Sequence, residues 1–128
     1  MHLVIDGFGG DRQLLADASL VQEMLDLYPE LLGMNKICAP VVVRYQGPVP
    51  EDWGISGVVM IAESHIAVHT FPERGMVWAD IFSCRPFQAE PVLADLRRRF
   101  RLQELSVQEL QRGLEYLPSP SQRQTMAG

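Results

Sequence analysis

The sequence GVVMIAESHIAV, residues 57–68, is the most apolar stretch of the chain. It contains two apolar runs, 57–62 and 66–68, which are separated only by Glu63-Ser64-His65. Short apolar runs that are rich in β-branched residues are typical of buried strands. We therefore predict two core strands joined by a short polar connection.

Two helices and further strands are predicted on either side of this pair. Apolar residues recur every three or four positions in 14–28 and in 90–100, which indicates amphipathic helices. Pro29 is expected to end the first helix because it lacks an N–H donor. The segment 118–128 is rich in Pro, Ser and Gln and is predicted to be a flexible tail. The other apolar runs predict strands at 3–5, 41–43, 76–82 and 105–110.

Strands that cluster between two helices favour an α+β fold. We expect a two-layer sandwich in which a mostly antiparallel sheet carries both main helices on one face. The chain has 128 residues, the size of one domain, which we predict over 1–117. The other face of the sheet is left apolar and uncovered in this arrangement, so the sequence also predicts a homodimer.

Composition excludes several classes of protein. The chain has 11 Lys and Arg against 16 Asp and Glu, a net charge of −5, so nucleic acid is not an expected partner. No apolar stretch reaches the roughly 18 residues that span a bilayer, and residues 1–6 lack the cationic start of a signal peptide. We therefore expect a cytoplasmic protein in which Cys38 and Cys84 are free thiols. The predicted solvated face of the second helix contains Arg97, Arg98 and Arg99, with Arg101 following them.

Residues 63–73, together with Ser56, Asp80 and Cys84, place a hydroxyl, two imidazoles, carboxylates and a thiol close together in sequence. Three interpretations compete. A Ser–His–acid hydrolase built on Ser64 lacks the usual G-x-S-x-G frame. A zinc site could use His65, His69 and Cys84, although the His-x-x-x-His spacing suits a helix better than a strand. A purely structural role remains, in which Ser64 and His65 cap a hairpin and Cys84 is a small buried side chain.

The segment ESHIAVHTFPE, residues 63–73, resembles the E-S-H-x-x-x-H-T-[WF]-P-E signature of the short prokaryotic S-adenosylmethionine decarboxylases. These are self-cleaving, pyruvoyl-dependent enzymes of spermidine synthesis. The resemblance extends to GISG at 54–57, to DIFSC at 80–84 and to the opening His2-Leu3, and so covers the chain to about Leu117. Three segments that match at fixed spacings make it specific.

The resemblance implies that the chain is cut between Glu63 and Ser64, giving chains 1–63 and 64–128. Ser64 then becomes a pyruvoyl group, which reacts with the substrate amine and takes up electrons as carbon dioxide leaves. His69 and Ser56 would assist the self-processing, Cys84 would donate a proton to the product, and Glu73 would bind the ribose hydroxyls. The cleaved protomers would form a homodimer with residues from both copies near each site.

Each assignment has a structural alternative. Ser56 could satisfy a turn, Glu73 could be a solvated surface charge, and Asp80 a buried, hydrogen-bonded acid. His65 is expected only to pack or to form hydrogen bonds. Cys38 has no counterpart in the motif and is expected to be an inert thiol.

The sequence departs from the family pattern in two places. Cys84 is followed by Arg85-Pro86-Phe87 where the family usually has glycine. The approach to Ser56, residues 44–53, is longer and more acidic than usual, so either Trp53 or Tyr45 could stack on adenine. Its two acidic residues, Glu51 and Asp52, could instead favour a basic substrate, which leaves a pyruvoyl-dependent arginine or ornithine decarboxylase as an alternative. A further alternative is an unprocessed, non-catalytic relative that binds a ligand.

Overall fold

The central hairpin is present in the computed structural model, which describes residues 1–113. Strands β3 (Gly54–Ile61) and β4 (Ser64–Phe71) pair antiparallel and are joined by the two residues Ala62-Glu63. Their side chains alternate between a buried and a more exposed face, as expected for strands that cover a core on one side. The predicted polar connection, 63–65, overlaps this loop only at Glu63, because Ser64 and His65 already pair as the first residues of β4.

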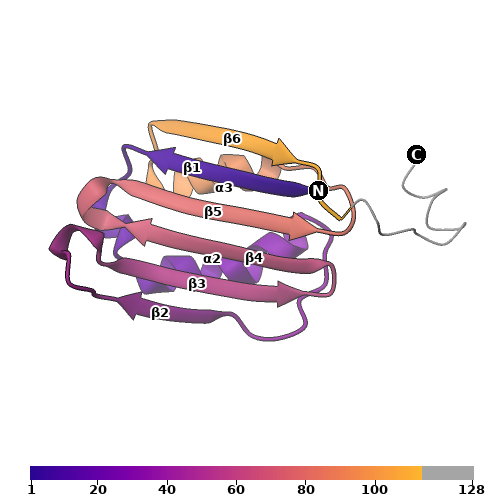
Figure 1. Ribbon diagram of the computed structural model, residues 1–128, viewed down its shortest axis with the longest axis horizontal. Coiled ribbons are helices and arrows are strands. Elements are labelled where there is room, and N and C mark those ends of the chain that lie inside the picture. Colours follow the sequence, from indigo (N-terminus) through magenta and orange to yellow (C-terminus); the bar gives the residue numbers. More distant parts are fainter. Residues whose placement is uncertain (114–128) are drawn as a thin grey trace, which may run out of the picture.

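Four further strands complete a six-stranded sheet with the order β2-β3-β4-β5-β1-β6, in which all neighbours are antiparallel (Figure 1). The two main helices lie on the same side of the sheet, as Figure 1 shows, so the predicted α+β two-layer fold is confirmed. None of the helices in residues 1–113 is long and apolar enough to cross a membrane. The additional strands are β1 (His2–Phe8), β2 (Val41–Tyr45), β5 (Met76–Ser83) and β6 (Glu104–Leu110).

The helices are α1 (Arg12–Leu15), α2 (Ala18–Leu31) and α3 (Glu90–Phe100), with short 3₁₀ turns η1 (Pro50–Asp52) and η2 (Pro72–Arg74). The core lies between α2, α3 and the sheet. Gly57 permits the close approach of α2 to β3, because a Cβ at this position would lie only 2.7 Å from the side chain of Leu25. The predicted tail, 118–128, and the last residues of the predicted domain lie outside the described residues.

The segment 14–28, predicted as one helix, contains two. Asp17 begins α2 by accepting a hydrogen bond from the Ser19 backbone N–H at 2.9 Å, which satisfies a donor that has no partner within the helix. The prediction that Pro29 ends the helix is also wrong. The helix continues past Pro29 to Leu31. Proline removes only its own N–H donor, and the carbonyls of this turn still accept: the Leu32 N–H donates to the Tyr28 carbonyl at 3.0 Å.

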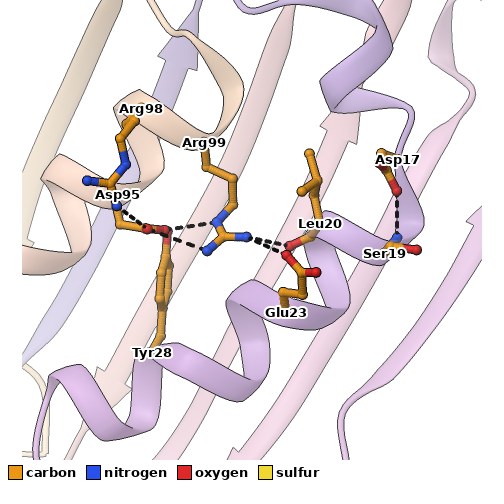
Figure 2. Close-up of polar contacts among 8 residues, drawn as sticks. All are labelled: Asp17, Ser19, Leu20, Glu23, Tyr28, Asp95, Arg98 and Arg99. Carbon is orange, nitrogen blue, oxygen red and sulfur yellow. Dashed lines mark hydrogen bonds and ion pairs between the residues drawn. The ribbon is translucent and has the colours of Figure 1, made fainter.

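The predicted solvated face of α3 is wrong for one residue, Arg99, whose side chain is only 12% exposed. Its Nε donates to Asp95 Oδ2 at 2.9 Å, and the Tyr28 hydroxyl of α2 donates to the same carboxylate at 2.8 Å (Figure 2). Burial opposes the charge on Asp95, but these hydrogen bonds outweigh it and lower the pKa of the carboxyl. The cluster Tyr28–Asp95–Arg99 thus joins the two main helices.

Replacing Asp95 with alanine is expected to lower the free energy of unfolding by about 3 kcal/mol, because Arg99 and Tyr28 lose their shared acceptor. Arg98→Ala is the matched control, since this 79% exposed side chain also contacts Asp95; the control should cost less than about 1 kcal/mol. Urea unfolding measures both, and equal losses would contradict a stabilising cluster. Because the folded-state pKa of Asp95 is lowered, its contribution is complete above the unfolded-state pKa and decreases as the pH falls through the folded-state value.

The face of the sheet opposite the helices is uncovered in residues 1–113. It exposes large apolar side chains on several neighbouring strands, which is unusual for a surface that meets only water. The most exposed of them are Val41, Val43, Tyr45, Met60 and Trp78.

Candidate active site

Ser64 is the first residue of β4 and directly follows the hairpin loop. Its φ is 156°, a positive value that residues other than glycine rarely adopt. Conformations of this kind cost roughly 1–3 kcal/mol and persist where the surrounding structure enforces them. The peptide bond between Glu63 and Ser64 therefore lies at a strained point of the chain.

Glu63 is fixed through its side chain, which is only 4% exposed. The carboxylate accepts hydrogen bonds from the Asn35 backbone N–H at 3.0 Å, from Asn35 Nδ2 at 3.1 Å and from the Arg85 guanidinium. Burial alone would raise the pKa of this carboxyl, but the hydrogen bonds from Asn35 and Arg85 outweigh burial and lower it. Arg85 occupies the position where the family pattern has glycine, so this departure supplies a partner for Glu63.

The carbonyl oxygen of Glu63 is also held, because the Cys84 backbone N–H donates to it at 3.0 Å. The sheet register explains the contact: Ser83, the last residue of β5, pairs with Ser64. A fixed N–H donor stabilises the negative charge that develops on a carbonyl oxygen when a nucleophile attacks the carbonyl carbon. The fold therefore brings together Glu63, Ser64 and Cys84, which we name the Ser64 half-site.

The Ser64 hydroxyl lies beside a row of polar side chains, which belong to His65, Asp80 and His2. Ser64 Oγ lies 3.3 Å from His65 Nδ1, and His65 Nε2 lies 3.3 Å from Asp80 Oδ2. His2 Nε2 lies 2.9 Å from the same Asp80 oxygen. The expected hydrogen bonding of His65 and Asp80 is confirmed, but the Asp80 side chain is 32% exposed and is not a buried acid.

His69 and Ser56 form a second group. They lie directly opposite each other in the β3–β4 register, and His69 Nδ1 is 2.9 Å from Ser56 Oγ. Ser56 lies within β3, so the alternative of a turn residue is wrong. We name this pair the His69 half-site.

The two half-sites do not meet within one chain. Ser64 and His69 lie five residues apart on β4, and the rise of a strand places them roughly 16 Å from each other. Figure 1 shows β4 extending over the length of the sheet. One protomer therefore carries two separate parts of the predicted site.

A cavity of about 710 Å³ opens on the uncovered face at the His69 half-site. Aromatic side chains line it: Phe71 and Trp78 pack with ring centroids 4.5 Å apart, and Tyr45 joins them. The only ion pair among the described lining residues is Arg74–Asp52, with Arg74 Nε 2.8 Å from Asp52 Oδ1. Of the two aromatic residues proposed to stack on adenine, Tyr45 lines this cavity and Trp53 does not.

Glu73 lies in a neighbouring groove with Arg12 and Trp53. Its Oε1 accepts hydrogen bonds from Arg12 Nε at 3.0 Å and from Trp53 Nε1 at 3.1 Å. These bonds, chiefly the one from Arg12, lower the pKa of the Glu73 carboxyl. The Arg44 guanidinium lies 4.3 Å from the Trp53 ring centroid, so Trp53 is already engaged by two neighbours.

The geometry tests two of the three interpretations of the motif, the zinc site and the hydrolase. His65 and His69 are four residues apart on one strand, roughly 13 Å, which is too far for one zinc ion with bonds of about 2 Å. In residues 1–113 no three His, Cys, Asp or Glu side chains are grouped to hold a metal. Ser64 does have a His–Asp row, but the Cys84 N–H is directed at the chain's own carbonyl. The arrangement is therefore suited to a reaction of the chain with itself.

Sequence reasoning missed several residues of the site. Asn35 and Arg85 hold Glu63 from segments distant in sequence, and no local pattern announces such contacts. Phe71 and Trp78 could have been found, because the alternation of β4 and β5 places them on the same face as His69.

Comparisons with known proteins agree with these observations. Residues 1–113 match the family described as S-adenosylmethionine decarboxylase. The chain is 31% identical over 115 residues to an S-adenosylmethionine decarboxylase proenzyme of Pyrococcus furiosus, covering 89% of this chain and 78% of that one. It is 34% identical over 113 residues to a proenzyme of the same description from Clostridium botulinum, covering 88% and 92%.

A solved structure is similar as well. The crystal structure of the adenosylmethionine decarboxylase from Aquifex aeolicus superposes with a TM-score of 0.74 at 26% identity. The match covers 92% of this chain and 93% of that one.

Proposed function

The chain belongs to the S-adenosylmethionine decarboxylase family, and on this premise we propose how its residues divide the chemistry. The family consists of pyruvoyl-dependent carboxy-lyases made as proenzymes, in which self-cleavage at a serine forms the pyruvoyl group. The chain is a proenzyme of this kind and acts on S-adenosylmethionine. In our proposal the serine is Ser64, and cleavage before it separates 1–63 from 64–128.

The observation that carries this assignment is the 3.0 Å hydrogen bond from the Cys84 N–H to the Glu63 carbonyl oxygen. Ser64 Oγ attacks the Glu63 carbonyl carbon, the amide C–N bond breaks, and an ester with a free Ser64 amine results. Removal of the Ser64 Cα proton then expels Glu63 as a carboxylate. The unsaturated residue at 64 adds water and loses ammonia. The pyruvoyl group supplies a carbonyl that accepts electrons as carbon dioxide leaves.

A homodimer unites the two half-sites. In this dimer two uncovered sheet faces stack about 10 Å apart. The two-fold axis lies between the sheets and is perpendicular to the strands, so that β4 of one protomer runs antiparallel to β4 of the other. The start of β4 then faces the later part of the partner's β4, so the partner's His69 comes within side-chain reach of Ser64. The stacking also buries the exposed apolar side chains of this face. Each dimer then holds two complete sites, with contributions from both protomers.

In the complete site, His69 of the partner subunit, hydrogen-bonded to Ser56, removes the Ser64 Cα proton in the elimination step. Cys84 is next to the cleaved bond and donates a proton to the product carbon after decarboxylation. A free thiol is needed for that step, so the proposal implies a reducing compartment such as the cytoplasm.

Cys84→Ala is expected to leave self-cleavage intact, because the backbone N–H on the Glu63 carbonyl does not depend on the side chain. Turnover should fall by at least about 100-fold, the usual contribution of a positioned general acid. Mass spectrometry measures cleavage, and carbon dioxide release measures turnover. Unchanged turnover, or a chain that remains uncut, would contradict the assignment. Cys38→Ala is the matched control and should change neither.

The cavity at the His69 half-site suits S-adenosylmethionine better than a basic amino acid. Its aromatic walls offer Tyr45, Phe71 and Trp78 for stacking on an adenine ring. Asp52 is already paired with Arg74 and presents no free charge to a second cationic group. The hydrogen bonds of Glu73 within residues 1–113 all use Oε1, which leaves Oε2 to accept ribose hydroxyls.

Release of labelled carbon dioxide from S-adenosylmethionine, arginine and ornithine tests this proposal. We expect release from S-adenosylmethionine alone. Release from arginine or ornithine at a comparable kcat/KM would support the alternative substrate, and an uncut chain that binds a nucleoside would support the non-catalytic alternative.

A further inference from the structure

We propose that His65 is the base that accepts the Ser64 hydroxyl proton when Ser64 attacks the Glu63 carbonyl, and that Asp80 and His2 hold His65 for this task. The proposal rests on the self-cleavage described above and assigns one step of it. The family motif gives no role to this histidine beyond packing or hydrogen bonding, so the assignment comes from the geometry.

The hydrogen bonds fix which nitrogen of His65 carries the proton. The Asp80 carboxylate only accepts hydrogen bonds, so His65 Nε2 at 3.3 Å must carry a hydrogen. In the neutral ring Nδ1 is then a free acceptor. Ser64 Oγ lies 3.3 Å from this Nδ1, a distance that catalytic hydrogen bonds shorten when the reaction proceeds. His65 is therefore in the tautomer that a base for Ser64 requires.

His2 strengthens the same arrangement from the other side of Asp80. The Arg112 guanidinium lies 3.4 Å from His2 Nδ1 and can only donate, so the hydrogen of neutral His2 resides on Nε2. This Nε2 donates to the Asp80 oxygen that also accepts from His65. Asp80 is thus anchored by a second donor and keeps a fixed position behind His65.

The aromatic ring of Phe82 packs against both imidazoles. Its centroid lies 5.8 Å from that of His65 and 5.4 Å from that of His2. The side chain of His65 is 35% exposed, and Phe82 covers one side of its ring. Packing and hydrogen bonds together hold the His65 ring beside Ser64 before any partner is present.

The proton balance of the step is complete within one chain. The Ser64 proton passes to His65 Nδ1 as the new C–O bond forms, and the Cys84 N–H stabilises the charge on the Glu63 oxygen. The same proton then passes from His65 to the departing Ser64 nitrogen as the amide bond breaks. The ester and a free amine result, and His65 returns to its neutral form.

His69 is not positioned for this step, since it lies roughly 16 Å away on the same strand. In the dimer proposed above it reaches Ser64 only from the partner. The two histidines therefore serve successive steps: His65 serves ester formation and the partner's His69 serves elimination.

Hydroxylamine distinguishes the two steps, because it cleaves an ester at Glu63 but not an amide. We would synthesise full-length chains in a cell-free system and follow cleavage by mass spectrometry with and without hydroxylamine. His69→Ala should accumulate a chain that hydroxylamine cuts after Glu63. His65→Ala should form this sensitive chain at least about 100-fold more slowly. His65→Asn should form the sensitive chain equally slowly, since the side-chain amide of asparagine can form a hydrogen bond with Ser64 but cannot accept its proton.

Asp80→Asn tests whether Asp80 positions His65. This variant also tests the proposal if the His65 variants fail to fold. It should slow the appearance of hydroxylamine-sensitive chain at least about tenfold while circular dichroism stays unchanged, as the loss of the orienting acid does in other Ser–His–Asp arrangements. If His65→Ala or, failing that, Asp80→Asn forms the ester at the rate of His69→Ala, the proposal for His65 is wrong. An unmodified chain that is never cut would overturn the proposed self-cleavage instead.

Discussion

Ser64→Ala is expected to remain a single chain of 128 residues and to have no decarboxylase activity above background. In our proposal the substitution removes the nucleophile that cuts the chain, and with it the source of the pyruvoyl group. Loss of an entire nucleophile and cofactor should lower kcat by about 10⁶-fold or more, as in enzymes whose nucleophile acts as one unit with its partners.

Ser106→Ala is a suitable control, because Ser106 is an exposed residue of β6 far from the hairpin loop. It should be cut and active. A Ser64→Ala chain that is still cut after Glu63, or that still releases carbon dioxide from S-adenosylmethionine, would show that another residue supplies the carbonyl.

The second large effect is expected in mixed dimers. Cys84→Ala should have little turnover, and His69→Ala should not be processed. If sites are shared across the dimer, a protomer of each kind gives one damaged site with both substitutions and one intact site. Random mixing of equal amounts should therefore restore about a quarter of wild-type activity.

The control for mixing uses two substitutions in the same half-site. Cys84→Ala mixed with Ser64→Ala should restore nothing, because each site of the mixed dimer then carries one of the two. If the Cys84→Ala and His69→Ala mixture is also inactive while native mass spectrometry shows mixed dimers, each site would be built within one protomer and the two-fold arrangement would be wrong.

Much of the fold could be predicted because its signals are local. The apolar runs around Glu63-Ser64-His65 and the helical repeat in 90–100 depend only on neighbouring residues. One error arose where a distant partner decides. Arg99 looks like a surface charge in its helix, but Asp95 and Tyr28 bury it between α2 and α3.

The site was predictable in part for the same reason. The motif pointed to Ser64, His69 and Cys84, but it did not predict that Ser64 and His69 lie toward different ends of one strand. The hydrogen-bonded row from Ser64 through His65 to Asp80 depends on the register of β4 against β5, which pairs His65 with Phe82 and places Asp80 beside it. Register follows from pairing across the sheet, and no single segment encodes it.

The intact mass of the purified, unmodified protein tests directly whether Ser64 becomes a pyruvoyl group. We expect two chains, residues 1–63 with an ordinary carboxyl end at Glu63 and residues 64–128 lighter than the encoded sequence by one ammonia, with no reactive amino terminus. A single chain of the full encoded mass after prolonged incubation, or a second chain that begins with an unmodified Ser64, would contradict formation of the pyruvoyl group at this residue.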